Sequence, residues 1–190
     1  MLFVGLGNPG STYCKTRHNI GFRVIDMLVS NLEPRNISKT SFYGKLFRLG
    51  TLFFLQPTTF MNVSGKSILA VKQFFKIEIE GIVVIHDDID LPFGAVRFKR
   101  GGGHGGHNGL KSIDDTIGRE YIRIRIGIGK PVHKSQVSDF VLHDFDPSEE
   151  ESVEALISYV ALVCQKIPTT DLEQIKSLYS VKNISQISTL

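Results

Sequence analysis

The chain has 190 residues, of which 42% are hydrophobic, so it is long enough to bury the core of one globular domain spanning residues 1–190. A formal net charge of +3 excludes a histone-like protein, and two cysteines are too few for a disulfide framework. Because it has no apolar run of membrane-spanning length and no basic-then-apolar leader, we expect a cytoplasmic monomer with no membrane partner.

The first half of the chain alternates strand-like and helix-like segments. An apolar run at 2–6 stops at a Gly-Asn-Pro-Gly turn and predicts a buried strand. Apolar residues at helical spacing over 18–32 predict a helix packed on a sheet. Segments 42–48 and 51–56 flank a glycine and predict a hairpin, and a second helix is expected over about 64–75. The residues expected on its inward side are Ile68, Leu69, Phe74 and Phe75.

The middle of the chain continues this alternation. A β-branched run at 82–85 predicts a buried strand, and 95–99 predicts a strand that leads into a glycine-rich loop. A third helix is expected over 108–117, with Gly118 as its C-terminal cap. Segment 121–129 alternates strictly, with isoleucines on one face and arginines and glycines on the other, as in a strand.

The C-terminal part is predicted to be helical. Residues 146–149, Asp-Pro-Ser-Glu, combine an N-cap, a first-turn proline and a capping-box glutamate at the start of a long helix. Pro168 ends this helix, and 171–179 predicts a last, weaker one. Strands alternating with helices around a hairpin predict an α/β fold: a three-layer α/β/α domain with a mixed, mostly parallel twisted sheet.

A glycine-rich loop stands in the middle of the chain. Six glycines occupy nine positions from Gly101 to Gly109, and His104, His107 and Asn108 lie among them. Glycines leave no side chains, so another molecule can approach the main chain closely. No Lys-Ser/Thr pair follows the last glycine, as a Walker loop requires, and the histidines do not suit a dinucleotide fingerprint. The loop therefore predicts a polar ligand of open identity, with a plain connecting tip as the alternative.

Charge is unevenly distributed along the chain. From Ala95 to Lys134 there are nine Lys/Arg and three Asp/Glu, whereas from Asp139 to Glu154 there are seven acids and no Lys/Arg. The basic middle suits a polyanion as partner, and the acidic stretch is expected to be the solvated start of a helix.

Polar residues gather in loops beyond the predicted strands, where ligand sites of α/β sheets collect. They are Asn8, His18, Asn62, Asp87 and the pair His107 and Asn108. Each has a structural explanation when taken singly: a turn for Asn8, a helix cap for His18 and Asn62, and a solvated acidic corner for Asp87. Together, a histidine, a carboxylate to orient it and several asparagines can activate water by general base catalysis and hold a carbonyl substrate.

Two metal sites were possible alternatives. His86, Asp88 and Asp90 share one strand face and could hold a hard divalent ion for phosphoester hydrolysis, but no second cluster supplies the remaining ligands. His104 and His107 lack a third ligand nearby. No serine or cysteine lies in a Gly-x-Ser-x-Gly elbow. We therefore expect no metal, no cofactor and no covalent nucleophile.

Five motifs occur in order between residue 2 and about residue 150. They are Gly5-Leu6-Gly7-Asn8-Pro9-Gly10, Tyr13 with Thr16-Arg17-His18-Asn19, Pro57-Thr58-Thr59-Phe60-Met61-Asn62 with Ser64-Gly65, His86-Asp87-Asp88-x-Asp90-Leu91-Pro92, and the Gly101–Gly109 loop. In type and spacing this set resembles the bacterial peptidyl-tRNA hydrolase family. The chain departs from the family pattern in a shortened connection between Gly118 and Tyr121 and in the tail after Pro168.

The resemblance implies hydrolysis of the ester between a peptide's C-terminal carboxyl and the 3'-terminal ribose of tRNA, which recycles peptidyl-tRNA released from stalled ribosomes. It implies that His18 is the general base and that Asp87 orients its imidazole. The implied substrate contacts are Asn8 for the peptide, Asn62 and Asn108 for substrate and water, Tyr13 and Phe60 along the nucleotide or peptide side, and Met61 and His107 beside them.

The resemblance also gives the basic residues a role. Phosphate contacts position a nucleic acid without reading its sequence. The candidates are Lys99, Arg100, Arg123 and Arg125, with a solubilising basic face as the alternative. A plant organelle branch of the family serves as an RNA-splicing partner, so RNA binding without hydrolysis is the second functional hypothesis, and a metal phosphoesterase is the third.

Overall fold

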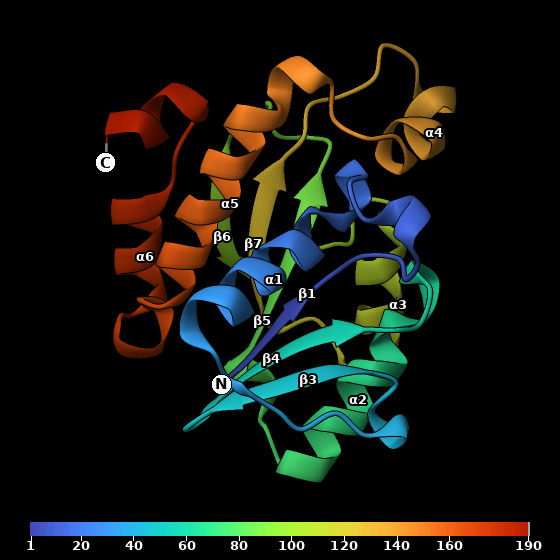
Figure 1. The fold of residues 1–190 in the computed structure, drawn as a ribbon, viewed down its shortest axis with the longest axis vertical. Coiled ribbons are helices and arrows are strands. Elements are labelled where there is room, and N and C mark those ends of the chain that lie inside the picture. Colours follow the sequence, from blue (N-terminus) through green and yellow to red (C-terminus); the bar gives the residue numbers. More distant parts are fainter. Residues whose placement is uncertain (190) are drawn as a thin grey trace.

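A computed structural model describes the backbone of residues 1–189, and their side chains except those of Lys134, Ser188 and Thr189. One mixed sheet of seven strands forms the middle of the molecule, in the order β2-β3-β4-β1-β5-β7-β6 (Figure 1). The strands are β1 (Leu2–Gly5), β2 (Arg35–Asn36), β3 (Gly44–Leu49), β4 (Leu52–Pro57), β5 (Ile82–Asp88), β6 (Val96–Arg100) and β7 (Ile122–Gly127).

The four central strands, β4, β1, β5 and β7, run parallel to one another. Strands β3 and β2 extend one side as an antiparallel hairpin, and β6 pairs antiparallel with β7 at the other edge. The parallel strands are buried on both faces, which is why their sequences read as continuous apolar runs. The predicted mixed sheet is confirmed.

Helices cover both faces of the sheet, as the three-layer prediction requires (Figure 1). Helices α1 (Ile20–Leu32) and α5 (Glu150–Cys164) pack together on one face, and α2 (Ser64–Phe75) and α3 (Asn108–Ile117) pack together on the other. Helix α6 (Leu172–Tyr179) contacts β6, and the short α4 (Val137–Leu142) lies outside the layers, near the start of α1. A separate buried apolar cluster lies under each helix layer. Among the helices of residues 1–189, none is long and apolar enough to span a bilayer.

Most predicted elements are confirmed, including the capping box that opens the turn before α5 and the cap of α3 by Gly118. One inward residue was predicted wrongly: Phe74 is 57% exposed, and Val71 is buried in its place. Val71 follows Ile68 at i+3 and so shares its inward side, whereas the Phe74 ring packs edge-on against Phe42 and Phe75. Strand β2 and helix α4 were not predicted, because two and six residues are too short for a periodic pattern to appear.

The direction of the strands positions the functional loops. The carboxyl ends of β1, β4, β5 and β7 lie at the same end of the sheet, which is the usual ligand-binding end of such folds. Strand β6 runs in the opposite direction. Val96 pairs with Ile126 near the ligand-binding end, and Arg100 pairs with Ile122 near the other end. The glycine-rich loop therefore begins at the end of the sheet away from the ligand-binding end and returns to the ligand-binding end, where α3 starts.

Candidate active site

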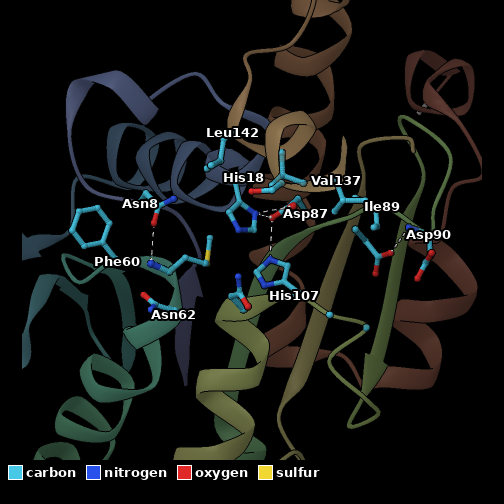
Figure 2. Close-up of a pocket in the computed structure, with 17 residues that line it drawn as sticks. Asn8, His18, Phe60, Asn62, Asp87, Ile89, Asp90, His107, Val137 and Leu142 are labelled. Atoms are coloured by element: carbon cyan, nitrogen blue, oxygen red, sulfur yellow. Dashed lines mark hydrogen bonds and ion pairs between the residues drawn. The ribbon is translucent and has the colours of Figure 1, made fainter. Parts of the chain in front are cut away.

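A cavity of about 700 Å³ opens at the carboxyl ends of the parallel strands (Figure 2). The loop after β1, the turn before α1, the segment after β4, the end of β5 and the start of α3 all contribute to its wall. Its polar lining includes Asn8, His18, Asn62, Asp87, His107 and Asn108. The structure thus brings together all six polar residues that the sequence placed beyond strand ends.

His18 and Asp87 form a buried pair on one side of this cavity. Nδ1 of His18 lies 2.9 and 3.0 Å from the two carboxylate oxygens of Asp87. A carboxylate only accepts hydrogen bonds, so Nδ1 carries the proton and donates it, and Nε2 is left as the basic nitrogen. The N-cap positions of the turn Arg17–Asn19 and of α1 are Thr16 and Asn19, and the His18 side chain bonds Asp87, so the capping explanation does not hold for His18.

The environment shifts the pKa of both partners in the direction that a general base needs. Burial alone would lower the pKa of His18, but the charge of Asp87 and its hydrogen bond outweigh burial and raise that pKa. Burial alone would raise the pKa of Asp87, but His18 and His107 hold it well below its usual range. Asp87 is therefore an anion throughout the physiological pH range, and it strengthens the imidazole as a base.

His107 supports the same carboxylate from the other side (Figure 2). Its Nδ1 accepts the backbone N–H groups of Gly109 and Leu110 at the start of α3, at 3.1 and 3.3 Å. Its proton must then lie on Nε2, which donates to Oδ1 of Asp87 at 3.0 Å. The helix N-terminus thus fixes the tautomer of His107, and the glycine-rich loop delivers the ring to Asp87.

This tautomer bears on whether a metal could bind here. His18, Asp87 and His107 offer three ligand atoms within 4.8 Å of one another, the only such group among the residues described. A cation at Nε2 of His107 would require an imidazolate, because the other nitrogen is occupied by two N–H donors. The donor set therefore suits hydrogen bonding better than metal coordination.

His86 and its two acidic neighbours serve the protein itself. Nδ1–H of His86 donates to the backbone oxygen of Asp87 at 2.7 Å, and burial together with His107 lowers the pKa of His86 to about 3. Asp88 accepts from Nε of Arg125 at 2.6 Å, and Asp90 pairs with Lys130. These partners agree with the structural role expected for His86 and leave the alternative metal set without support.

The asparagines differ in how much of their side chain is free. Oδ1 of Asn8 accepts the backbone N–H of Met61 at 2.9 Å. The side-chain amides of Asn62 and Asn108 form no hydrogen bond within residues 1–189, and both face the cavity. These two amides are available to a substrate.

The remaining predicted contacts lie at different places. Met61 is buried in the cavity wall, and Phe60 stands at the rim with 58% of its surface exposed. Tyr13 is half-buried on the turn Ser11–Tyr13 and does not line the cavity.

The four basic candidates also separate in space. Arg125 lies beside the cavity through its bond to Asp88, and Lys99 lies on the same face of the sheet, next to Gly102. Burial and the nearby charges of Arg125 and Arg123 lower the pKa of Lys99. Arg100 follows Lys99 directly and therefore lies on the other face of β6, where it donates to the backbone oxygen of Glu120.

Arg123 does not fit its predicted role as a surface phosphate contact, because its side chain is only 1% exposed. Its guanidinium donates to the backbone oxygens of Gly102 and Gly103 at 2.7 Å and to Asp114 at 3.0 Å. The alternating pattern placed Arg123 correctly on the polar face of β7. The glycine-rich loop folds over that face and buries it.

Sequence reasoning missed the contribution of α4 to the cavity. Val137, Ser138, Val141 and Leu142 close one side of it. The only signal was a short apolar pattern inside an acidic stretch, which was assigned to a solvated helix start.

Comparisons with known proteins identify the family of the chain. Residues 2–187 match the model of a family described as peptidyl-tRNA hydrolase. The peptidyl-tRNA hydrolase of Sulfurovum sp. is 66% identical over 183 residues, which are 96% of this chain and 97% of that protein. The one from Sulfurimonas denitrificans is 53% identical over 183 residues, covering 96% and 98% of the two chains. A crystal structure of a variant of peptidyl-tRNA hydrolase from Acinetobacter baumannii is similar with a TM-score of 0.85 at 38% identity, covering 96% of this chain and 95% of that one.

Proposed function

The chain belongs to the peptidyl-tRNA hydrolase family, and from this premise we propose that it cleaves the peptidyl ester of tRNA by general base catalysis through His18. The observation that carries this mechanism is the orientation of His18: its Nδ1–H is held by a buried carboxylate, and its ring lines the cavity. The hydrogen bond from His107 keeps that carboxylate in place and adds no second base, since its own tautomer is fixed.

In the proposed reaction, Nε2 of His18 takes a proton from water as the water oxygen attacks the ester carbonyl. The imidazolium that forms is stabilised by Asp87. The carbonyl oxygen becomes an oxyanion, which amide N–H groups of Asn62 and Asn108 can stabilise. The C–O bond to the ribose then breaks, and the protonated His18 returns its proton to the ribose oxygen. The immediate products are a peptide carboxylic acid, which loses its proton to solvent to become the carboxylate, and tRNA with an intact 3'-terminal hydroxyl.

The neutral donors suit a substrate that is a polyanion. Asparagine donates and accepts without adding a charge beside the phosphates. On the polar face that β6 and β7 share, Lys99 and Arg125 are the cations we propose for phosphate contact. Arg123 is better explained as a support for the loop. Action as a cytoplasmic monomer stays a prediction.

The function is tested with two substrates. We expect the chain to release N-acetyl-amino acid from N-acetyl-aminoacyl-tRNA without added metal, and to cleave tRNA carrying a free amino group much more slowly. A protonated amine needs a carboxylate partner, and each of the three carboxylates in the cavity lining already has one: Asp87 accepts from two histidines, Asp88 pairs with Arg125 and Asp90 pairs with Lys130. The measurement is the initial rate of ester cleavage for each substrate, with and without chelator.

Three results would contradict the proposal in different ways. Equal rates for both substrates would remove the substrate specificity. If a chelator abolished activity, the result would favour the third hypothesis, a metal-dependent phosphoesterase. Tight binding of tRNA with no turnover would favour the RNA-binding alternative.

Salt dependence tests the phosphate contacts. Lys99→Ala and Arg125→Ala should raise KM and should each flatten the slope of log(kcat/KM) against log[salt] by about 0.7–0.9, the contribution of one phosphate contact. Arg100→Ala, a matched change on the other face of β6, is the comparison. Unchanged slopes for Lys99→Ala and Arg125→Ala would favour a solubilising role for both residues, and an equal change for Arg100→Ala would show that tRNA also contacts the other face.

A further inference from the structure

Asn19, directly after the catalytic histidine, holds the backbone of Asn8. Its side chain is 1% exposed. Its Nδ2 donates to the backbone oxygen of Asn8, and its Oδ1 accepts the backbone N–H of the same residue, both at 2.9 Å. One amide thus satisfies both main-chain groups of Asn8, as a neighbouring strand would. Oγ1 of Thr16 lies 3.5 Å from Oδ1 of Asn19, but its hydroxyl donates over the shorter distance of 2.9 Å to the backbone oxygen of Tyr13.

The orientation of the Asn8 side chain follows from its own partner. The backbone N–H of Met61 can only donate, so the Asn8 atom that faces it at 2.9 Å must be Oδ1. The amide cannot flip without placing two donors against each other. Asn8 lines the cavity and its oxygen is already used, so it presents its Nδ2 donor to a substrate.

This orientation depends on Asn19, because Asn8 stands in a turn that has no strand neighbour. Pro9 follows it and has no N–H, and Gly10 has a φ of 109°, which gives the turn an otherwise strained path. Without Asn19, both backbone groups of the buried Asn8 would lack a partner, and the main chain could move relative to Met61.

We infer that Asn19 is a positioning residue that fixes Asn8 as a hydrogen-bond donor and thereby selects substrates that present an acyl carbonyl beside the scissile ester. The inference rests on the proposed function. An N-acylated amino acid offers a carbonyl acceptor to the Asn8 donor. A free amino group is a protonated donor, so it meets a second donor and gains no hydrogen bond. Discrimination against aminoacyl-tRNA then comes from the fact that Asn8 offers a donor and not an acceptor. Asn19, the residue after His18, keeps Asn8 in that orientation.

The test compares kcat/KM for N-acetyl-aminoacyl-tRNA with kcat/KM for the matching aminoacyl-tRNA. Asn8→Asp keeps the acceptor for Met61 and replaces only the cavity-facing donor. Asn19→Asp keeps the acceptor for the Asn8 N–H and loses the donor to the Asn8 oxygen. Each variant should lower the ratio of the two values by about two- to tenfold, the equivalent of one lost hydrogen bond. The double variant should lower it no further than the stronger single variant, since the two residues act as one unit.

Ser67→Ala is the matched control, because it removes a buried side-chain hydrogen bond to a backbone oxygen, that of Phe42, away from the cavity. It should lower the melting temperature and leave the ratio unchanged. The inference is overturned if Asn19→Asp slows both substrates by the same factor, which is what a purely structural role predicts, or if Asn8→Asp keeps the ratio. A wild-type chain that cleaves neither substrate would contradict the proposed function as well, so the two failures are distinguishable.

Discussion

His18→Ala should lower kcat for N-acetyl-aminoacyl-tRNA by about 10²–10⁴, the range expected for loss of a positioned general base. KM should change little, because His18 is proposed to act on water and not to bind the substrate. We expect the fold to be retained, since His107 still donates to the buried carboxylate of Asp87. Steady-state kinetics measure the effect, and the circular dichroism spectrum with the melting temperature verifies the fold. A loss below about threefold would exclude His18 as the base.

Asp87→Asn is the companion variant, and it tests the pairing. His18 acts as a base only when neutral, so activity falls as the pH drops through its pKa. The wild-type carboxylate raises that pKa, and its neutral replacement should lower it. The acid limb of the kcat/KM profile should therefore move to lower pH, while the plateau falls because the ring loses basicity and orientation. The double variant should be barely worse than His18→Ala alone. If the acid limb stayed at the same pH and the activity losses of the two single variants multiplied in the double variant, Asp87 would not be the partner of His18.

Much of the fold could be predicted because its elements are long or strongly patterned. The apolar run before Asn8 and the alternating isoleucines of β7 are periodic enough to define buried strands. The parallel direction of the strands then places the loop residues at one end of the sheet. For this reason Asn8, His18, Asn62 and Asp87 could be grouped before any geometry was known.

What could not be predicted depends on how segments fold over one another. Alternation places Arg123 on the polar face of β7, but it does not say whether that face meets solvent or a loop. Asn19 belongs to a motif, but its two bonds to Asn8 exist only because the loop after β1 and the start of α1 come together. These are tertiary contacts, and no local periodicity encodes them. The tautomer of His107 is set by a local helix cap, but its contact with Asp87, 20 residues away, exists only in the folded chain.

The burial of Arg123 leads to the largest expected effect on stability. Asp114 is nearly inaccessible, and Arg123 is its buried cationic partner, at 3.0 Å. Arg123→Met leaves this carboxylate with the hydroxyl of Tyr121 and a longer, exposed contact to Arg119. Breaking one side of a buried ion pair costs about 3–5 kcal/mol, so the free energy of unfolding should fall by that amount. Urea denaturation monitored by circular dichroism measures it.

Two further variants show whether the cause is the unpaired carboxylate. Arg123→Met combined with Asp114→Leu removes both charges and should recover part of the stability, because no buried charge is left without a partner. Arg100→Met, the same change at an exposed arginine, should alter the free energy of unfolding by no more than about 0.5 kcal/mol. If Arg123→Met were instead as stable as the wild type and flattened the salt dependence of tRNA cleavage, the guanidinium would be a phosphate contact, and the glycine-rich loop would have to open to expose it.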